Sequence, residues 1–223
     1  MAKKLRDITV EEFIKVNEFV AHTSPMRSHY NSSNPLERWV WRQKKRKIQA
    51  FLEEIKIRSI VDLGCGDGGL IEIIDSTIFY TGIDISPTQL SFTKNYIKTI
   101  GRKNAVVKEG DVTVLDFSDS EFDAALACDI VEHVLSPEKL FKEIKRIVKK
   151  DGYIIFGIPN EVMWEVARAL TLKFPLRSPD HIHAIFTDDI KRNFPMVLKE
   201  VALPFPLLKG LSLINVFLVK NVK

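Results

Sequence analysis

The chain has 223 residues, of which 45% are hydrophobic and 28% are charged. This composition excludes a disordered chain, a collagen-like repeat and a small disulfide-stapled fold, and the length fits one compact domain better than two. The two cysteines, Cys65 and Cys128, are too few for a disulfide framework, so we expect two buried thiols in a reducing compartment. No apolar stretch reaches the roughly 20 residues that a bilayer requires, and the N-terminus carries no signal sequence, so we expect a cytoplasmic protein.

The net charge of +4 is concentrated in the N-terminal part of the chain. Residues 1–60 contain 13 Lys or Arg against 7 Asp or Glu, whereas the remainder contains 20 against 22. A basic segment of this kind is typical of a solvated helix face. It also suits a nucleic acid, an anionic membrane surface or an acidic substrate, and these alternatives stay open at this point.

Two helices are predicted before the first strand. Apolar residues recur at helical spacing from Thr9 to Val20, and Thr9 forms a capping box with Glu12. A loop from His22 to Asn34 leads into a second helix that ends near Lys56. The apolar stripe of this second helix consists of Leu36, Trp39, Val40, Ile48, Phe51, Leu52 and Ile55, and its other face carries Arg38, Arg42, Lys44, Lys45, Arg46 and Lys47.

After Arg58, short apolar runs alternate with helical patterns, which is typical of a parallel sheet buried on both faces. Strands are predicted at Ser59–Leu63, Phe79–Asp84, Ala105–Lys108, Phe122–Cys128, Tyr153–Ile158, Val197–Val201 and Ser212–Lys220. Helices are predicted at Gly69–Asp75, Pro87–Thr99, Pro137–Lys149, Glu161–Leu172 and Thr187–Asn193, with Ser86 and Ser136 as N-caps of the second and third.

This alternation predicts an α/β fold with a Rossmann-like, doubly wound, mostly parallel seven-stranded sheet. The last two strands are separated by two prolines and a glycine, so we expect a C-terminal antiparallel hairpin rather than another βα unit. The apolar stripe of the N-terminal segment has no core of its own. We therefore expect one compact unit in which residues 1–55 are a helical cover over the domain of residues 56–223.

A glycine-rich turn follows the first predicted strand, in the run Ile60 to Gly69. Glycine suits a backbone that must turn tightly and approach a ligand closely. The spacing also matches the dinucleotide fingerprint, so the turn alone does not choose between NAD and an adenosyl ligand. Asp62 lies two residues before the first glycine, where a carboxylate suits a cationic ligand better than a pyrophosphate. Asp84 ends the second strand and can accept ribose hydroxyls, and Asp111 follows the third strand and can face an adenine amino group.

The segments VDLGCGDG, GIDIS, EGDV, FDAALACDIVEHV and FKEIKRIVKKDGYIIFGIPN, in this order, resemble class I S-adenosylmethionine-dependent methyltransferases. The resemblance covers residues 59–160 closely and implies S-adenosylmethionine as the cofactor. It implies the following donor-binding residues: Asp62, Gly64, Gly66 and Gly68 at the aminocarboxypropyl end, Asp84 and Ile85 at the ribose, Asp111 and Val112 at the adenine, and Cys128 with Asp129 as the floor beneath the sulfonium.

Candidate catalytic residues follow the fourth predicted strand. Asp129, Glu132 and His133 are spaced i, i+3 and i+4, so one helical turn would gather them on one face. His181 is the preferred distal partner, over His183. This set resembles the ExxEH signature with a distal histidine that holds a divalent metal in quinone-biosynthesis and small-RNA methyltransferases, but Asp129 replaces the first Glu. We therefore favour a metal-independent enzyme, with Asp129, Glu132, His133 and His181 as the ligands if a metal binds.

A small apolar or ring-containing molecule is the favoured methyl acceptor, with O-methylation as the favoured reaction. The support is an apolar insert after the fifth strand, composed of Trp164, Ala167, Leu170, Leu172, Phe174 and Leu176, although these residues could equally pack a helix onto the core. The basic and aromatic segment from Arg38 to Lys47 keeps an RNA 2′-O-methyltransferase as the alternative. A non-catalytic nucleotide- or RNA-binding protein and peripheral membrane contact are further alternatives. The oligomeric state stays open.

Overall fold

The computed structural model describes residues 9–23, 26–170, 181–207 and 209–223. Its centre is one seven-stranded sheet in the order β3-β2-β1-β4-β5-β7-β6. The strands are β1 (Ser59–Leu63), β2 (Phe79–Asp84), β3 (Ala105–Glu109), β4 (Phe122–Cys128), β5 (Val148–Pro159), β6 (Val197–Leu203) and β7 (Ile214–Lys220). The first five strands pair in parallel, and β7 is antiparallel to both β5 and β6. The predicted doubly wound sheet and its C-terminal hairpin are confirmed.

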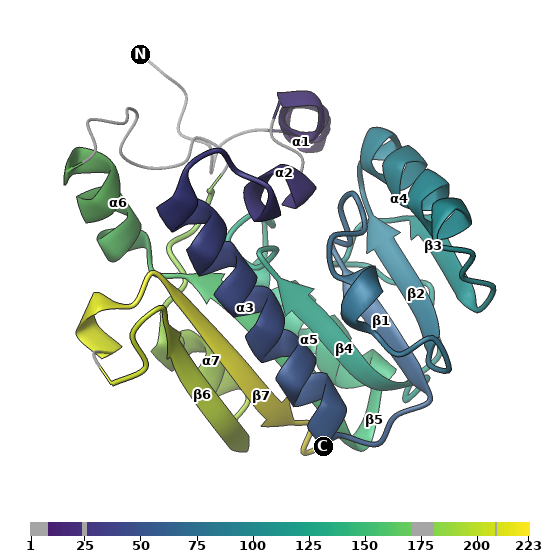
Figure 1. Cartoon of the computed structure of the whole chain (residues 1–223). Coiled ribbons are helices and arrows are strands. Elements are labelled where there is room, and N and C mark those ends of the chain that lie inside the picture. Colours follow the sequence, from purple (N-terminus) through teal and green to yellow (C-terminus); the bar gives the residue numbers. More distant parts are fainter. Residues whose placement is uncertain (1–8, 24–25, 171–180, 208) are drawn as a thin grey trace.

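Helices cover both faces of this sheet (Figure 1). They are α1 (Val10–Thr23), α2 (Met26–Tyr30), α3 (Pro35–Glu54), α4 (Pro87–Thr99), α5 (Pro137–Ile147), α6 (Glu161–Leu170) and α7 (Thr187–Asn193), with short 3-10 turns η2 (Ile71–Ile73) and η3 (Lys209–Leu211). In Figure 1, α3 runs across the near face over the strands, whereas α5 and α7 lie behind them. Among the described residues, no helix combines the length and the apolar character needed to cross a membrane.

Each face of the sheet has its own hydrophobic core. Behind the sheet, residues of α5 and α7, including Ile144 and Ile190, pack with strand residues such as Ala125 and Phe156. On the near face, α3 contributes fully buried side chains to a second core that also contains residues of β1 and β4. Burying each large apolar side chain contributes roughly 1.5–3 kcal/mol, so α3 is bound to the sheet by several such contributions.

Two predicted connections differ from the structure. The predicted loop between the first two helices contains α2, whose Arg27 N–H donates a 2.8 Å hydrogen bond to the Asp67 carboxylate in the glycine-rich turn. The predicted helix from Gly69 to Asp75 is only the 3-10 turn η2. Helix α2 is stabilised at its start by Asp67, forty residues away in the chain. The residue spacing within 22–34 therefore could not predict this helix.

The buried face of α3 also differs from the prediction. Lys44, expected on the polar face, is fully buried at 0% exposure, whereas Leu36 and Trp39 of the expected stripe are 59% and 39% exposed. The side chain of Lys44 forms an ion pair with Asp129 at the end of β4. An ion pair can compensate the cost of removing an ammonium group from water, which hydropathy cannot anticipate. The remaining predicted residues, from Val40 to Ile55, are buried as expected.

Two of the three predicted helix caps are confirmed, and Asn34 forms a further cap. Thr9 and Glu12 form the reciprocal capping box at the start of α1, with hydrogen bonds of 2.7 and 3.2 Å. The Ser86 hydroxyl accepts a hydrogen bond from Gln89 N–H, and Asn34 caps α3 through its side-chain oxygen. Ser136 precedes α5 but makes no side-chain capping bond. Both cysteines are free and buried, as predicted.

Candidate active site

The glycine-rich turn leaves β1 in a backbone conformation that side chains disfavour. Gly64, Gly66 and Gly68 have φ values of +71°, +52° and +79°. The turn is held to β2, because Gly64 N–H and Cys65 N–H both donate to the carbonyl of Ile83, at 2.8 and 2.9 Å. A Cβ added to Gly66 would meet no atom within 4 Å. At Gly66 the turn therefore presents open backbone, which is the surface that a closely approaching ligand requires.

Asp84 connects this turn to the next strand and helix. One carboxylate oxygen accepts from Gly66 N–H at 2.8 Å, and the other accepts from Ser86 N–H at 2.9 Å. Burial raises the pKa of Asp84, although these backbone donors oppose the rise. An ionised carboxylate has about four acceptor positions, so two remain for a ligand hydroxyl pair. Ile85, next to Asp84, is partly buried.

Asp62 lies within β1, two residues before the glycine turn. Its side chain is 3% exposed and accepts a 2.9 Å hydrogen bond from the Tyr80 hydroxyl. Burial raises the pKa of Asp62 to about 7, against the Tyr80 hydrogen bond and the charge of Lys44, which both lower it. A buried acid without a directly bound cation is a favourable neighbour for a cationic ligand.

Asp111 and Val112 follow β3, whose end lies beside the end of β2. Gly110 N–H donates to the carbonyl of Asp84 at 3.0 Å, so the two predicted ligand-binding turns are adjacent. The Asp111 carboxylate is exposed and accepts from both the N–H and the hydroxyl of Thr113, each at 2.8 Å. Val112 is buried. The structure thus places all the predicted donor-binding residues at the carboxyl ends of β1 to β4.

The end of β4 does not continue into the predicted helical turn. Asp129 has a φ of +52°, and its N–H donates to the Gly157 carbonyl at 2.8 Å. Its carboxylate points to Lys44 instead of joining the residues that follow. The side chains of Glu132 and His133 are brought together by a non-helical turn. Burial raises the pKa of the Cys128 thiol, so this cysteine is a neutral thiol rather than a nucleophile.

A second cluster lies beyond this turn. Ligand atoms of Glu132, His133 and His181 all lie within 4.8 Å of one another, and the two imidazole rings meet edge to face at 4.8 Å between centroids. The backbone fixes this contact, because Ile182 N–H and His183 N–H donate to the Glu132 carbonyl at 2.9 and 3.2 Å. The preferred distal histidine, His181, therefore joins the cluster. His183 instead faces the Leu135 carbonyl at 3.4 Å.

Glu161 is a member of this site that the sequence did not reveal. It begins α6, is 7% exposed, and its carboxylate contacts Nδ1 of His181. A carboxylate on Nδ1 fixes the ring orientation and directs Nε2 away from it, whether that nitrogen then binds a metal or a proton. The only available signal was an acidic residue in the first turn of the helix after β5. That position is common to ordinary helices and so carried no specific information.

Glu132 has one carboxylate oxygen, Oε2, that is buried without a hydrogen-bond partner among the described residues. Burial raises the pKa of this carboxyl group, against the effect of His133 and His181. Buried polar atoms normally have partners, so this oxygen indicates a missing ligand or a bound proton. Carboxylate and two imidazoles form a donor set that suits Zn²⁺, Mn²⁺ or Fe²⁺, and the residues therefore fit a divalent metal.

Part of the predicted acceptor side lies outside the described residues. Leu172, Phe174 and Leu176 fall in this part of the chain. Within α6, Trp164 packs against the near-face core, whereas Leu170 is 81% exposed.

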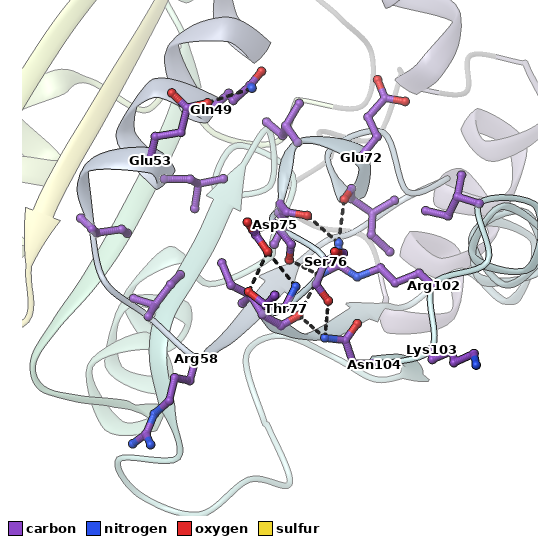
Figure 2. A pocket seen from close by; sticks show the side chains of 18 of the residues that line it. Gln49, Glu53, Arg58, Glu72, Asp75, Ser76, Thr77, Arg102, Lys103 and Asn104 are labelled. Carbon is purple, nitrogen blue, oxygen red and sulfur yellow. Dashed lines mark hydrogen bonds between the residues drawn. The ribbon is translucent and has the colours of Figure 1, made fainter.

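A cavity of about 1230 Å³ lies at the opposite, amino end of the parallel strands (Figure 2). It is bordered by the end of α3, by η2 and by the residues before β3. Arg102 donates to the carbonyls of Ile71, Ile74, Asp75 and Ile78, and Asn104 donates to those of Ser76 and Ile78. These side chains hold the surrounding loops together. Ligands of open α/β sheets bind at the carboxyl ends, so we place the active site at the glycine turn and not here.

Comparison with known proteins agrees with this geometry. Residues 61–156 match the family described as Methyltransferase domain. Together with the sheet order and the glycine turn, this match identifies residues 61–156 as a class I S-adenosylmethionine-dependent methyltransferase domain, as predicted.

Individual relatives differ in what they methylate. The chain is 32% identical over 110 residues to sterol 24-C-methyltransferase ERG6B of Gibberella zeae, covering 48% of this chain and 28% of that protein. It is 26% identical over 107 residues to ubiquinone biosynthesis O-methyltransferase of Coxiella burnetii, covering 48% and 45%. These matches span less than half the length of either relative.

Among solved structures, magnesium protoporphyrin IX methyltransferase of Synechocystis PCC 6803, solved with bound SAH, superposes with a TM-score of 0.69. The superposition covers 93% of this chain and 99% of that one at 13% identity, and it shows a shared fold.

Proposed function

We propose that the protein transfers a methyl group from S-adenosylmethionine to a small apolar or ring-containing molecule, with O-methylation as the favoured reaction. The observation that carries this proposal is the juxtaposition at one sheet edge of the open Gly66 backbone, the Asp84 and Asp62 carboxyl groups, and the cluster of His133 and His181. Relatives named for sterol and ubiquinone methylation support a small apolar acceptor and leave the accepting atom to experiment.

The chain's residues fit the donor. Gly66 leaves room for a ligand against the backbone, Asp84 retains acceptor positions for two ribose hydroxyls, and buried Asp62 favours a positively charged group. The sulfonium of S-adenosylmethionine supplies an activated methyl group, so the protein has to orient the reactants and exclude water. Few catalytic side chains are needed.

The acceptor side is assigned to the Glu132, His133 and His181 cluster. A hydroxyl acceptor must lose its proton, and an imidazole within hydrogen-bond reach can accept it. Glu161 contacts Nδ1 of His181, so Nε2 is the ring nitrogen that faces away from this carboxylate. We assign His133 and His181 to orienting the acceptor and accepting its proton.

A divalent metal is a second candidate for the same cluster, supported by the unpartnered Oε2 of Glu132. Glu132, His133 and His181 would hold the ion, and Asp129 would not, because its carboxylate is paired with Lys44. A bound ion would act as a Lewis acid that lowers the pKa of an acceptor hydroxyl. The test is calorimetric titration of Mn²⁺ and Zn²⁺ into wild type and Glu132→Gln. Binding that Glu132→Gln abolishes supports the metal, and wild type without binding contradicts it.

The donor assignment is tested by calorimetric titration with S-adenosylmethionine, S-adenosylhomocysteine and NAD. We expect both adenosyl ligands to bind and NAD to give no response. Asp84→Ala should weaken donor binding by at least about a hundredfold, because hydrogen bonds to a charged acceptor are each worth roughly 1.5–3 kcal/mol. Tighter binding of NAD would contradict the proposed function, and wild-type donor affinity in Asp84→Ala would remove Asp84 from the ribose site.

The acceptor class is tested by incubating the protein and radiolabelled donor with lipid extract, total RNA or total protein. We expect label in the lipid or small-molecule fraction, and label in RNA would support the RNA alternative instead. His133→Ala should lower turnover at least about a hundredfold while donor affinity stays within about twofold of wild type. Unchanged turnover would exclude His133 from the site.

A further inference from the structure

Lys44 is a buried ammonium group at the centre of the site that the proposed reaction does not use. It lies in the middle of α3 with 0% of its side chain exposed, and it forms an ion pair with Asp129, whose side chain is 9% exposed. The fold makes room for it, because a Cβ added to Gly157 in β5 would lie 2.7 Å from Lys44 Cε. Burying a charged pair is costly, so its presence at this place calls for a role.

Asp129 is part of the predicted floor of the donor site, and Lys44 contacts it from α3. The same Cβ position on Gly157 lies 3.3 Å from both Lys44 Nζ and Cys128 Sγ, and Cys128 precedes Asp129 in the chain. The groups that face the Lys44 ammonium are Asp129 and Cys128 from β4, Asp62 from β1 and the Trp41 ring of α3 at 4.9 Å. A fixed positive and a fixed negative charge therefore adjoin the place where the sulfonium is expected.

Methyl transfer changes the charge at that place. The donor carries a positive sulfonium, whereas the demethylated product is a neutral thioether. An unpaired carboxylate at Asp129 would attract the donor and leave the product almost unaffected, and an unpaired ammonium at Lys44 would repel the donor. Two unit charges several ångströms apart near a protein surface interact strongly enough to alter the relative affinity about fivefold or more.

We propose that Lys44 and Asp129 form a charge-compensated pair that sets the relative affinity of the enzyme for the methyl donor and its demethylated product. The proposal rests on the donor binding proposed above. Lys44 acts through Asp129 and through the field at the floor, without touching the donor. An unpaired Asp129 carboxylate would bind the positive sulfonium more tightly than the transition state, in which this charge is being lost, and would thereby raise the activation barrier. Pairing Asp129 with Lys44 limits this effect.

The experiment is calorimetric titration at pH 8 with S-adenosylmethionine and S-adenosylhomocysteine, in wild type, Lys44→Met, Asp129→Asn and the double variant. Lys44→Met keeps the side-chain volume but removes the charge. We expect the ratio of product Kd to donor Kd to rise about fivefold or more in Lys44→Met and to fall about fivefold or more in Asp129→Asn. The double variant should return to within about twofold of wild type.

Lys199→Met is the matched control, because Lys199 joins β6 to α3 through an exposed ion pair with Glu54. It should leave the ratio unchanged. Thermal unfolding checks that each variant is folded, and Asp129→Asn, the smaller change, provides the test alone if Lys44→Met does not fold. Failure of wild type to bind either ligand would overturn the proposed function. The proposed charge compensation would be overturned if the ratio of product Kd to donor Kd were the same in all variants. It would also be overturned if this ratio changed in the same direction in Lys44→Met and Asp129→Asn.

Discussion

At the scale of single residues, the site is built from carboxyl groups that the fold has removed from water. Burial raises the pKa of Asp62, Asp84 and Glu132, and no Arg or Lys of the described chain forms an ion pair with any of the three. Asp129, by contrast, is paired with Lys44. A cationic donor would supply part of the charge that the other acids lack, so we expect donor binding and their ionisation to favour each other.

Asp62 gives a measurable dependence of stability on pH. Its folded-state pKa of about 7 lies above the ordinary 3.8, so the folded chain binds more protons than the unfolded chain between these values. Its stabilising contribution is present below the unfolded pKa and is lost as the pH rises through about 7. We therefore expect the melting temperature of wild type to fall by several degrees relative to Asp62→Asn between pH 4 and pH 7, and not beyond pH 8.

Tyr80→Phe provides the companion measurement. The Tyr80 hydroxyl donates to Asp62 and lowers the pKa of Asp62. Removing this hydroxyl should therefore extend the loss of stability to higher pH than in wild type. The measurement is thermal unfolding in a series of buffers from pH 4 to pH 9. A constant difference between wild type and Asp62→Asn across this range would show that Asp62 is ionised throughout.

At the scale of elements, alanine substitutions can distinguish a glycine of the proposed ligand-binding turn from a glycine that only ends a helix. Gly66 and Gly101 both have positive φ, +52° and +65°, and a Cβ added to either would meet nothing within 4 Å. Gly101 follows α4, where its N–H donates to the Lys98 carbonyl at 3.1 Å. Alanine at either position should cost about 1–2 kcal/mol in backbone strain. Only Gly66→Ala should weaken donor binding, by at least about tenfold, because its Cβ would fill the proposed ligand space.

Chemical denaturation and donor titration of the two variants test this comparison. Equal losses of stability with unequal donor affinities are expected. Equal donor affinities would show that the ligand does not approach Gly66.

The strands were the most predictable elements. The bounds of β1, β2 and β4 agree with the prediction, because strands buried on both faces appear as continuous apolar runs between turn residues. Helices whose ends are stabilised by local caps, such as α4, were also predicted, with the first residue at Pro87. Their signals lie within a few residues of one another.

Features that depend on distant partners were not predictable. The start of α2 is hydrogen-bonded to a carboxylate forty residues away. Lys44 is paired with an acid eighty-five residues away, and Glu161 contacts His181, twenty residues further along the chain. The candidate site shows the same division. Its glycines and acids at strand ends were predicted by position, whereas the diversion of Asp129 away from the cluster follows from a contact that only the fold creates.

At the scale of the whole molecule, the N-terminal segment and the sheet share one core. Val40, Ile48, Phe51 and Leu52 of α3 pack on the near face, and Lys44 reaches the active site from the same helix. Helix α2 is hydrogen-bonded to the glycine turn through Arg27. This supports the proposal that residues 1–55 are a cover over the donor site rather than a separate domain.

Truncation tests that proposal. A chain beginning at Lys56 would expose the near-face core, and the loss of each large buried side chain costs about 2–5 kcal/mol, which exceeds the total stability of a typical domain when summed over α3. We expect this chain to be insoluble or to unfold without cooperativity in chemical denaturation. A chain beginning at Asn34 keeps α3 and its cap, so it should fold and show weakened donor binding, because α2 no longer meets Asp67. A stable chain from Lys56 with wild-type donor affinity would instead make residues 1–55 an independent arm, and the basic face of α3 would then favour an RNA substrate.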